Sequence, residues 1–334
     1  MKKTLIGAVV ASLVAGSAFA ESHVEAIMPA VVYDLGGKFD QSFNQAAYTG
    51  AERFMEETGI EYRDFEIQND AQREQALRRF AQQGHNPIIA IGFSHGAAVE
   101  KVSAEFPDTD FAIVDMVVEQ PNVRSIVFKE QEGSYLAGVA AALASESQAV
   151  GFVGGMDIPL IRKFECGFLG GARSVNPDIE FIGNMTGTDG SAWNNPTRGD
   201  ELARSQFARG VDVIYHAAGG TGVGVLQAAA DEGKLGIGVD SNQNGMHPGA
   251  ILTSMLKRVD NAVFDSFSDA MNGEFTYGFD VNGLAEEGVG LALDENNEEL
   301  MTAEILEAVN LARQQIVEGE VVVHDYTSDS ACPY

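Results

Sequence analysis

Positive charge is scarce in this sequence. Its 334 residues include 21 Lys and Arg against 49 Asp and Glu, which gives a formal net charge of −28 at pH 7 with neutral histidines. A surface this negative repels phosphate backbones and anionic lipid headgroups. We therefore expect no nucleic-acid partner and no membrane-surface partner. The acidic residues are scattered rather than gathered in blocks, which is typical of a solubility adaptation and not of an acidic tail.

Sequence motifs for metal ions and nucleotide cofactors are also missing. The six histidines never stand three or four positions apart, which gives zinc no local pair of ligands. The run that starts at Asp240 begins like a calcium loop, but its twelfth position is Ile251, where a bidentate glutamate is needed. No Walker A motif occurs, and the glycines at 220–224 lack the spacing of a dinucleotide fingerprint. We therefore expect no metal and no cofactor.

Long apolar segments are absent after residue 20, so no membrane-spanning helix is expected there. The first twenty residues carry two lysines, then a short apolar run at 5–14, then small residues that end in Ala-Phe-Ala at 18–20. This pattern predicts a secretory signal peptide over residues 1–20. No cysteine follows the cleavage site, so no lipid anchor is expected. The mature chain should begin near Glu21 and be a soluble periplasmic protein.

Only two cysteines, Cys166 and Cys332, are present. In an oxidising compartment an even pair favours a disulfide. The alternative is two free thiols, one buried and one near the C-terminus. A disulfide requires a specific Cα separation, which the sequence does not supply, so both states stay open at this point.

The hydrophobic pattern alternates between strands and helices. A near-continuous apolar run such as 87–92 is typical of a parallel strand buried on both faces. Helical stretches such as 41–57 separate the strands, and the series restarts at residue 149. Two successive α/β units of similar size predict an α/β protein with two doubly wound parallel-sheet lobes. A C-terminal helix at 303–317 and a last strand at 320–324 are also predicted.

One motif suggests an enzyme. The stretch Gly-Phe-Ser-His-Gly at 92–96 fits the G-x-S-x-G pattern of a nucleophile elbow between a strand and a helix. Asp115 with His216 or His247 would complete a serine hydrolase triad around Ser94. No oxyanion segment of the HGGG type precedes the motif, however. We therefore favour the simpler interpretation, in which Ser94 caps a helix at the edge of a cleft.

Polar residues stand where several predicted strands end. Asp34, Asp115 and Asp240 each follow an apolar strand, and the pair Gly219-Gly220 follows another. Ligands of open α/β sheets bind at the carboxyl ends of the strands. Two such lobes facing each other would form a cleft, in which three carboxylates could hold an uncharged ligand with several hydroxyl groups.

These strand ends carry motifs that resemble those of the basic membrane protein family, the purine nucleoside receptors of ABC transporters. The resemblance covers most of the mature chain. The motifs that carry it are DLGGKFDQSFN at 34–44, IGFSHG at 91–96, AIVD at 112–115, AAGGTG at 217–222, IGVD at 237–240 and TSMLK at 253–257.

The resemblance implies a type I periplasmic binding protein fold with three hinge crossings. It implies a first lobe of residues 21–127 and 257–280, and a second lobe of residues 128–256 and 281–334. The ligand is expected between these two lobes.

The resemblance also implies roles for individual residues. Phe43 would stack on the base, with Trp193 as the opposite aromatic residue. Asn44 and Asp115 would hydrogen-bond the base edge, and Asp240 would bind the ribose hydroxyls. Gly220, Lys257 and Asp34 would complete the pocket.

The sequence thus leads to a periplasmic receptor that binds a purine nucleoside and delivers it to an ABC permease of the inner membrane. We expect a monomer without enzymatic activity. The family usually has Lys or Arg where this chain has Gln41, and the segment around Trp193 departs from the family pattern. A receptor for another flat ring, such as a flavin, or for a sugar is therefore an alternative, and a secreted serine hydrolase using Ser94 is a second one.

Overall fold

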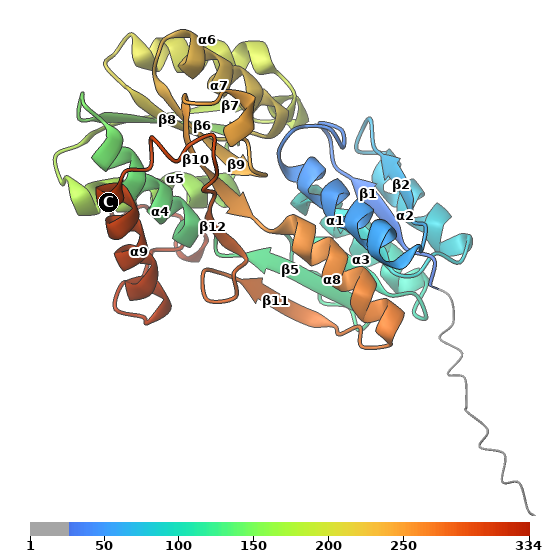
Figure 1. Ribbon diagram of the computed structural model, residues 1–334. Coiled ribbons are helices and arrows are strands. Elements are labelled where there is room, and N and C mark those ends of the chain that lie inside the picture. Colours follow the sequence, from blue (N-terminus) through green and yellow to red (C-terminus); the bar gives the residue numbers. More distant parts are fainter. Residues whose placement is uncertain (1–26) are drawn as a thin grey trace, which may run out of the picture.

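The computed structural model describes residues 27–334, and the predicted signal peptide at 1–20 lies outside the described residues. Two lobes of α/β structure stand side by side (Figure 1). Each lobe contains a six-stranded sheet, with strand orders β11-β5-β4-β3-β1-β2 and β12-β10-β9-β8-β6-β7. The first sheet is parallel throughout, and in the second only β12 is antiparallel to its neighbour. The predicted pair of doubly wound lobes is confirmed.

The first lobe is built from five consecutive strands, one later strand and four helices. The strands are β1 (Ala30–Tyr33), β2 (Arg63–Glu66), β3 (Ile88–Ile91), β4 (Phe111–Val114), β5 (Val123–Phe128) and β11 (Gly278–Asn282), and the helices are α1 (Phe43–Thr58), α2 (Gln72–Gln82), α3 (Gly96–Glu105) and α8 (Val259–Asn272).

The second lobe repeats this plan. Its strands are β6 (Ala149–Met156), β7 (Glu180–Gly187), β8 (Val213–Ala217), β9 (Leu235–Asp240), β10 (Ile251–Lys257) and β12 (Val289–Leu291), and its helices are α4 (Glu130–Ala144), α5 (Pro159–Val175), α6 (Pro196–Phe207), α7 (Gly222–Asp231) and α9 (Ala303–Val317).

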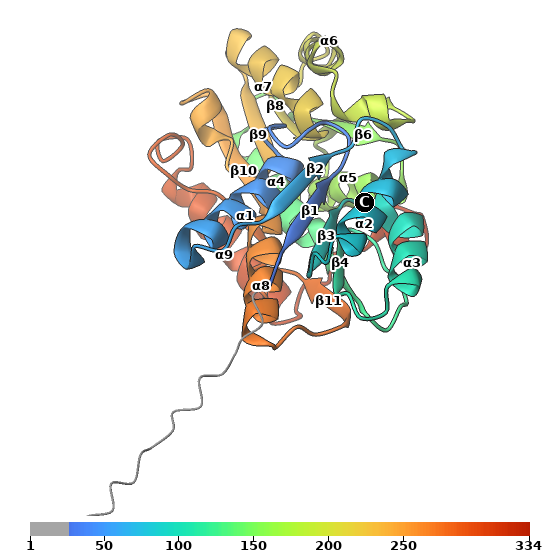
Figure 2. The same cartoon turned by 90° about the vertical axis from the view of Figure 1, so that its right-hand side faces the viewer.

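Alternation along the strands explains why helices cover both faces of the first sheet. Val31 and Tyr33 of β1 belong to the core on the side of α1 and α8, whereas Ala30 and Val32 belong to the core on the side of α2 and α3. Figure 2 shows these two helix layers on either side of β1, β3 and β4. Successive side chains of a strand point to opposite faces, so a strand buried on both faces must be apolar throughout.

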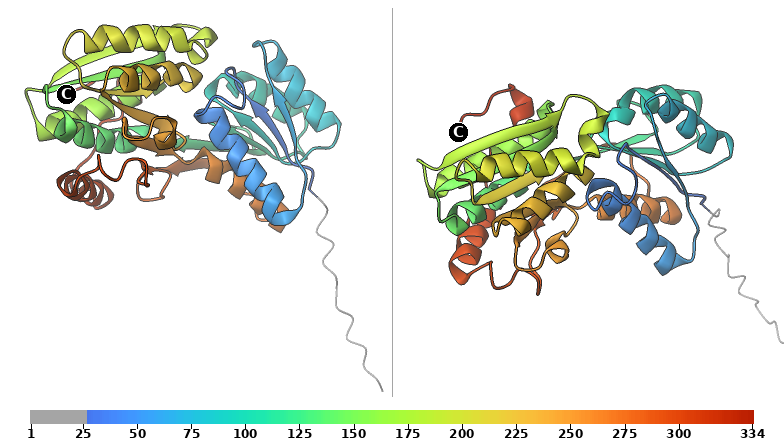
Figure 3. Two further views of the ribbon diagram at one scale, coloured as in Figure 1. Left: turned by 45° about the horizontal axis from the view of Figure 1, so that its top comes forward. Right: turned by 90° about the horizontal axis from the view of Figure 1, so that it is seen from above.

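The chain passes between the lobes three times. The passages lie between β5 and α4, between β10 and α8, and between β11 and β12. Two further views show α8 beside α1 in the first lobe although two hundred residues separate them, and α9 on the outer side of the second lobe (Figure 3). The three predicted hinge crossings are therefore present, and the carboxyl ends of both sheets face the space between the lobes.

The predicted strand at 320–324 is wrong, because this segment has no strand partner. Its alternating pattern has another cause: Val323 is buried against the core and Val321 packs beside it, while Val322 is exposed. Within residues 27–334, no helix is both long enough and apolar enough to cross a membrane.

Candidate functional site

A cavity of about 60 Å³ lies between the two lobes. Small-molecule sites in proteins usually combine apolar walls with a few precisely placed polar groups. The wall of this cavity has that composition. The wall is formed by Asp34, Leu35, Asp40, Phe43, Asn44, Gly92, Phe93 and Asp115 of the first lobe, and by Leu160, Ile161, Phe164, Trp193, Ala217, Gly219, Val239, Asp240 and Lys257 of the second.

The start of α1 presents a set of fixed polar groups to this cavity. The carboxylate of Asp40 accepts hydrogen bonds from the backbone N–H groups of Ser42, Asn44 and Gln45 and from the side-chain amide of Asn44. Carboxylates are favourable at this end of a helix, where backbone N–H groups are unpaired. The amide oxygen of Asn44 accepts from the N–H of Asp34 at 3.0 Å. Both the oxygen and the nitrogen of the Asn44 amide therefore have hydrogen-bond partners. These bonds fix the orientation of the amide.

Asp34 is held at the end of β1 by an ion pair. Its Oδ1 lies 2.6 Å from the guanidinium of buried Arg73 on α2. Burial raises the pKa of Asp34, although the charge of Arg73 opposes that shift. Gly92, with a φ of 108°, lets Asp34 approach closely, because a Cβ atom at Gly92 would lie 2.4 Å from Oδ2 of Asp34.

Lys257, at the end of β10, is the cation of the cavity. Its ammonium lies 2.6 Å from Oδ2 of Asp115 and 2.9 Å from Oε1 of Glu130, and its Nζ is 5.1 Å from the centre of the Phe43 ring. Burial opposes the charge on Lys257, but the two carboxylates outweigh burial and raise its pKa above the usual value. The other oxygen of Asp115, Oδ1, is buried without a hydrogen-bond partner among the described residues. Such a group needs a donor, which a ligand can supply.

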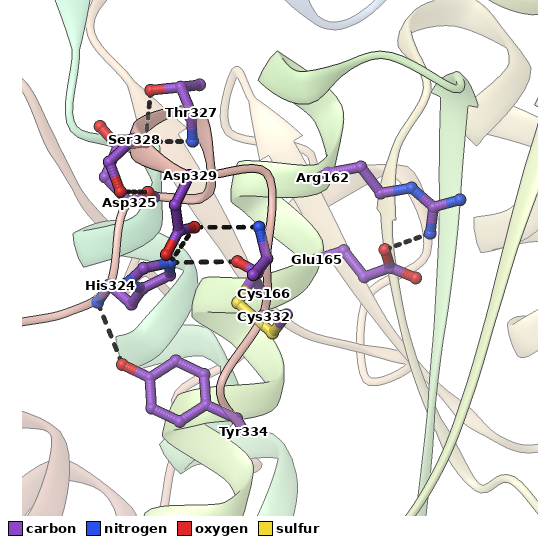
Figure 4. Close-up of a disulfide and its surroundings, with 11 residues drawn as sticks. Arg162, Glu165, Cys166, His324, Asp325, Thr327, Ser328, Asp329, Cys332 and Tyr334 are labelled. Atoms are coloured by element: carbon purple, nitrogen blue, oxygen red, sulfur yellow. Dashed lines mark hydrogen bonds and ion pairs between the residues drawn. A yellow bond between two sulfur atoms is a disulfide. The ribbon is translucent and has the colours of Figure 1, made fainter.

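The ion pairs continue from the cavity to the C-terminal tail. Glu130 also lies 2.8 Å from Nζ of Lys163 on α5, and Lys163 in turn lies 3.9 Å from Asp325 of the tail. Figure 4 shows the tail held against α5 by the disulfide between Cys166 and Cys332, whose Cα atoms are 5.6 Å apart. The tail is therefore tied to the same helix that supplies Leu160, Ile161 and Phe164 to the cavity wall.

Asp240 ends β9 with a left-handed backbone, φ 63°, and Asp115, the residue after β4, has the same conformation, φ 69°. Aspartate tolerates this conformation better than most residues. Burial raises the pKa of Asp240 to about 7, against the lowering effects of the Lys257 charge and of a hydrogen bond from Ser42. Asp240 is thus a buried carboxylate whose ionised form is costly unless hydrogen-bond donors surround it.

Trp193 belongs to a short 3-10 helix, Gly190–Trp193, between β7 and α6. Its ring packs on Gly155 of β6 so closely that a Cβ atom there would lie 2.1 Å from the ring. Trp193 and Phe43 both line the cavity, from opposite lobes. The position of the Trp193 ring against β6 requires glycine at position 155.

The structure brings together most of the residues predicted to bind the ligand. Gly220 is the exception, because it faces the backbone of Trp193 and the side chain of Asp40, and its neighbour Gly219 lines the cavity instead. Sequence reasoning assigned no role to Asp40, Phe164 or Glu130. Asp40 could have been found as a helix cap, since it stands just before a helical pattern.

The hydrolase motif is arranged differently from a catalytic triad. Ser94 lies on the wall of a second hollow, which shares Asp34, Leu35 and Trp193 with the main cavity. Asp115 pairs with Lys257, and His216 is hydrogen-bonded to Gln243 at 2.9 Å. Among the described residues, no hydrogen bond joins Ser94 to Asp115, to His216 or to the alternative partner His247, and Asp115 is not bonded to either histidine.

Comparison with protein families identifies this architecture. A family model described as "ABC transporter substrate-binding protein PnrA-like", named Bmp, matches residues 8–326. The chain belongs to the Bmp family. The resemblance found in the sequence motifs is thereby confirmed, and the family is one of substrate-binding proteins of ABC transporters.

Several known proteins are similar to this chain over most of their length. The CD4+ T-cell-stimulating antigen of Listeria monocytogenes is 35% identical, with 88% of this chain and 87% of the relative covered. The ABC transporter nucleoside-binding protein BmpA of Lactococcus lactis is 33% identical, with 88% of each chain covered. A Pyrococcus abyssi relative called an uncharacterized lipoprotein is 32% identical, with 86% and 74% covered.

Solved structures agree with this assignment. A solute-binding protein of an ABC transporter system from Aeropyrum pernix superposes with a TM-score of 0.82 at 30% identity, covering 89% of this chain and 94% of that one. A second solute-binding protein, from Conexibacter woesei, has a TM-score of 0.73 at 21% identity, covering 90% and 99%, and supports the fold alone. The fold is that of the type I periplasmic solute-binding proteins.

Proposed function

We propose that this member of the Bmp family binds a purine nucleoside in the cavity between its lobes. The observation that carries the proposal is the composition of the wall: aromatic rings from both lobes, four aspartates and a single lysine. Aromatic rings stack on a base with about 1–3 kcal/mol per base. The surplus of carboxylates favours a ligand that is uncharged and rich in hydrogen-bond donors.

The parts of a nucleoside match particular groups of the wall. Phe43 and Trp193 are proposed to enclose the base. Asn44 and the unpartnered Oδ1 of Asp115 are proposed to hydrogen-bond the base edge, and buried Asp240 the ribose hydroxyls. Hydrogen bonds to an ionised carboxylate are the stronger kind. The printed name of the Lactococcus lactis relative, a nucleoside-binding protein, supports the same ligand class.

In this proposal the protein is exported to the periplasm as a soluble monomer and gives its ligand to an ABC permease without chemical turnover. The division of the wall between two lobes supports closure around the ligand, since a ligand that touches both lobes favours the closed state. Some relatives are called lipoproteins, so the proposed absence of a lipid anchor has its own test. That test is the mass of the mature protein isolated from its native cell.

The test is a calorimetric titration with adenosine, guanosine and inosine, after removal of any co-purified ligand by unfolding and refolding. We expect heat from at least one nucleoside and a rise in its melting temperature, because a ligand that binds only the native state must stabilise it. Riboflavin and arabinose serve as comparison ligands. Binding of either one, with no heat from any nucleoside, would show that the ligand class is wrong.

A further inference from the structure

Direct hydrogen bonds join the two lobes beside the cavity. They connect the residues just before α1, in the first lobe, with the end of β9 and the segment after it, in the second. The hydroxyl of Ser42 lies 2.6 Å from Oδ2 of Asp240. The hydroxyl of Ser241 donates to the carbonyl of Ser42 at 2.7 Å, and the side-chain amide of Gln243 donates to the carbonyl of Gln41 at 3.0 Å.

We propose that Ser42 is a positioning residue, whose hydroxyl aims the carboxylate of Asp240 at the ligand only when the lobes are closed. The proposal rests on the proposed function, in which Asp240 binds ligand hydroxyls. Ser42 belongs to the lobe opposite Asp240, so this hydrogen bond cannot survive separation of the two segments. The polar wall is therefore complete only in the closed molecule.

The surroundings of Asp240 explain why one hydroxyl matters. Ser42 is completely buried, and Asp240 is 8% exposed. The Ser42 hydroxyl occupies Oδ2, and Asp240 lines the cavity, so we infer that Oδ1 is the oxygen left for a ligand hydroxyl. A buried carboxylate oxygen without a donor is costly, so the ionised form of Asp240 depends on this contact.

The segment that carries the Asp240 side of the contact is held by hydrogen bonds to β8 and β9. Gln243 is buried, and its side-chain oxygen accepts from the N–H of Val239 at 2.8 Å and pairs with Nε2 of His216 at 2.9 Å. Because that oxygen can only accept, His216 must donate from Nε2. Burial lowers the pKa of His216 to about 4, so the ring is neutral at pH 7. Gln243 therefore has its amide nitrogen free to reach across to Gln41.

The charged and titratable groups around Asp240 make the contact testable by pH. Lys257 from β10 favours the carboxylate, whereas Asp40 from the start of α1 and Asp115 from the end of β4 oppose it. The phenol of Tyr215 on β8 also faces this region and is neutral, because burial raises its pKa well above the usual value. Ligand affinity should therefore rise with pH as Asp240 ionises, and the Ser42 hydrogen bond should set the midpoint of that rise.

The experiment compares Ser42→Ala with Ser241→Ala, titrating each with guanosine, adenosine and inosine between pH 5.5 and 8.5. Each substitution deletes one hydroxyl that crosses between the lobes, but only Ser42 touches the Asp240 carboxylate. For Ser42→Ala we expect about tenfold weaker binding or more at pH 7 and a pH midpoint that moves upward. For Ser241→Ala we expect a smaller loss that is equal at every pH, with an unmoved midpoint.

The outcomes separate this proposal from the proposed function. Binding by the wild type together with an unmoved midpoint in Ser42→Ala overturns the positioning role of Ser42 and leaves the ligand assignment intact. Equal upward shifts in both variants also overturn it, because the effect would then come from lobe closure alone. Absence of heat from every nucleoside with the wild type overturns the proposed function and this proposal with it.

Discussion

Replacing Lys257 with methionine should lower the free energy of unfolding by about 3–5 kcal/mol at pH 7. The ammonium of Lys257 compensates two buried carboxylates, those of Asp115 and Glu130. Methionine keeps most of the side-chain length that packs near the Phe43, Phe128 and Phe164 rings, so the loss measures mainly the uncompensated charge. Denaturant unfolding of the ligand-free protein, followed by circular dichroism, measures this loss in the free energy of unfolding.

A double variant separates charge from packing. Lys257→Met combined with Asp115→Asn removes one cation and one anion, and Glu130 keeps its pairing with Lys163. We expect the double variant to regain much of the lost stability. Arg162→Met is the surface control, since Arg162 pairs with Asp157 and Glu165 near the surface and should cost at most about 1 kcal/mol. A loss below this control value for Lys257→Met would contradict the account of the ion network.

Asp240→Asn should weaken nucleoside binding and, at pH 8, stabilise the ligand-free protein. The native pKa of Asp240, about 7, lies above the usual aspartate value of 3.8. The native state therefore binds a proton more tightly than the unfolded state does, and stability contributed by this group falls as pH rises from about 4 to 7. At 1.36 kcal/mol for each pKa unit, the ceiling of the gain at pH 8 is about 4 kcal/mol.

The two effects of Asp240→Asn are measured separately. Denaturant unfolding at pH 4 and pH 8 should show a stability gain that is small at pH 4 and large at pH 8. Calorimetry should show a loss of about 1.5–3 kcal/mol for a nucleoside and a smaller loss for the free base, which lacks ribose hydroxyls. Equal losses for nucleoside and base would place Asp240 away from the ribose, and a gain that is independent of pH would contradict the assigned titration.

Much of the architecture was predictable because local pattern determines it. The run Ile88–Ile91 is apolar at every position, which suits only a strand covered on both faces, and the structure places it in the middle of the first sheet. Asp34 and Asp115 could be grouped because the carboxyl ends of parallel strands meet at one edge of a sheet, and Asp240 joins them because the second sheet presents the same edge to the cleft. The prediction of a strand at 320–324 failed because an alternating pattern shows which side chains are buried. It does not show whether the backbone pairs with another strand.

The rest depends on contacts between residues far apart in the chain. The pairing of Ser42 with Asp240 spans 198 positions, and that of Lys257 with Asp115 spans 142. Neither residue of such a pair carries a local signal of its partner. Glu130 looks like an ordinary acidic residue in the first turn of α4, where carboxylates are common. Its burial between two lysines comes from the packing of α4 against α5, which carries Lys163, and against β10, which carries Lys257, and a single sequence does not reveal this packing.

The most direct test of the central claim is a co-crystal structure with the nucleoside that gives the largest heat of binding. We predict density for its base between Phe43 and Trp193, with the ribose hydroxyls within hydrogen-bonding distance of Asp240. The lobes should remain joined through Ser42, as in the present structure. A nucleoside bound elsewhere on the molecule, with the cavity between the lobes lacking ligand density, would contradict the account.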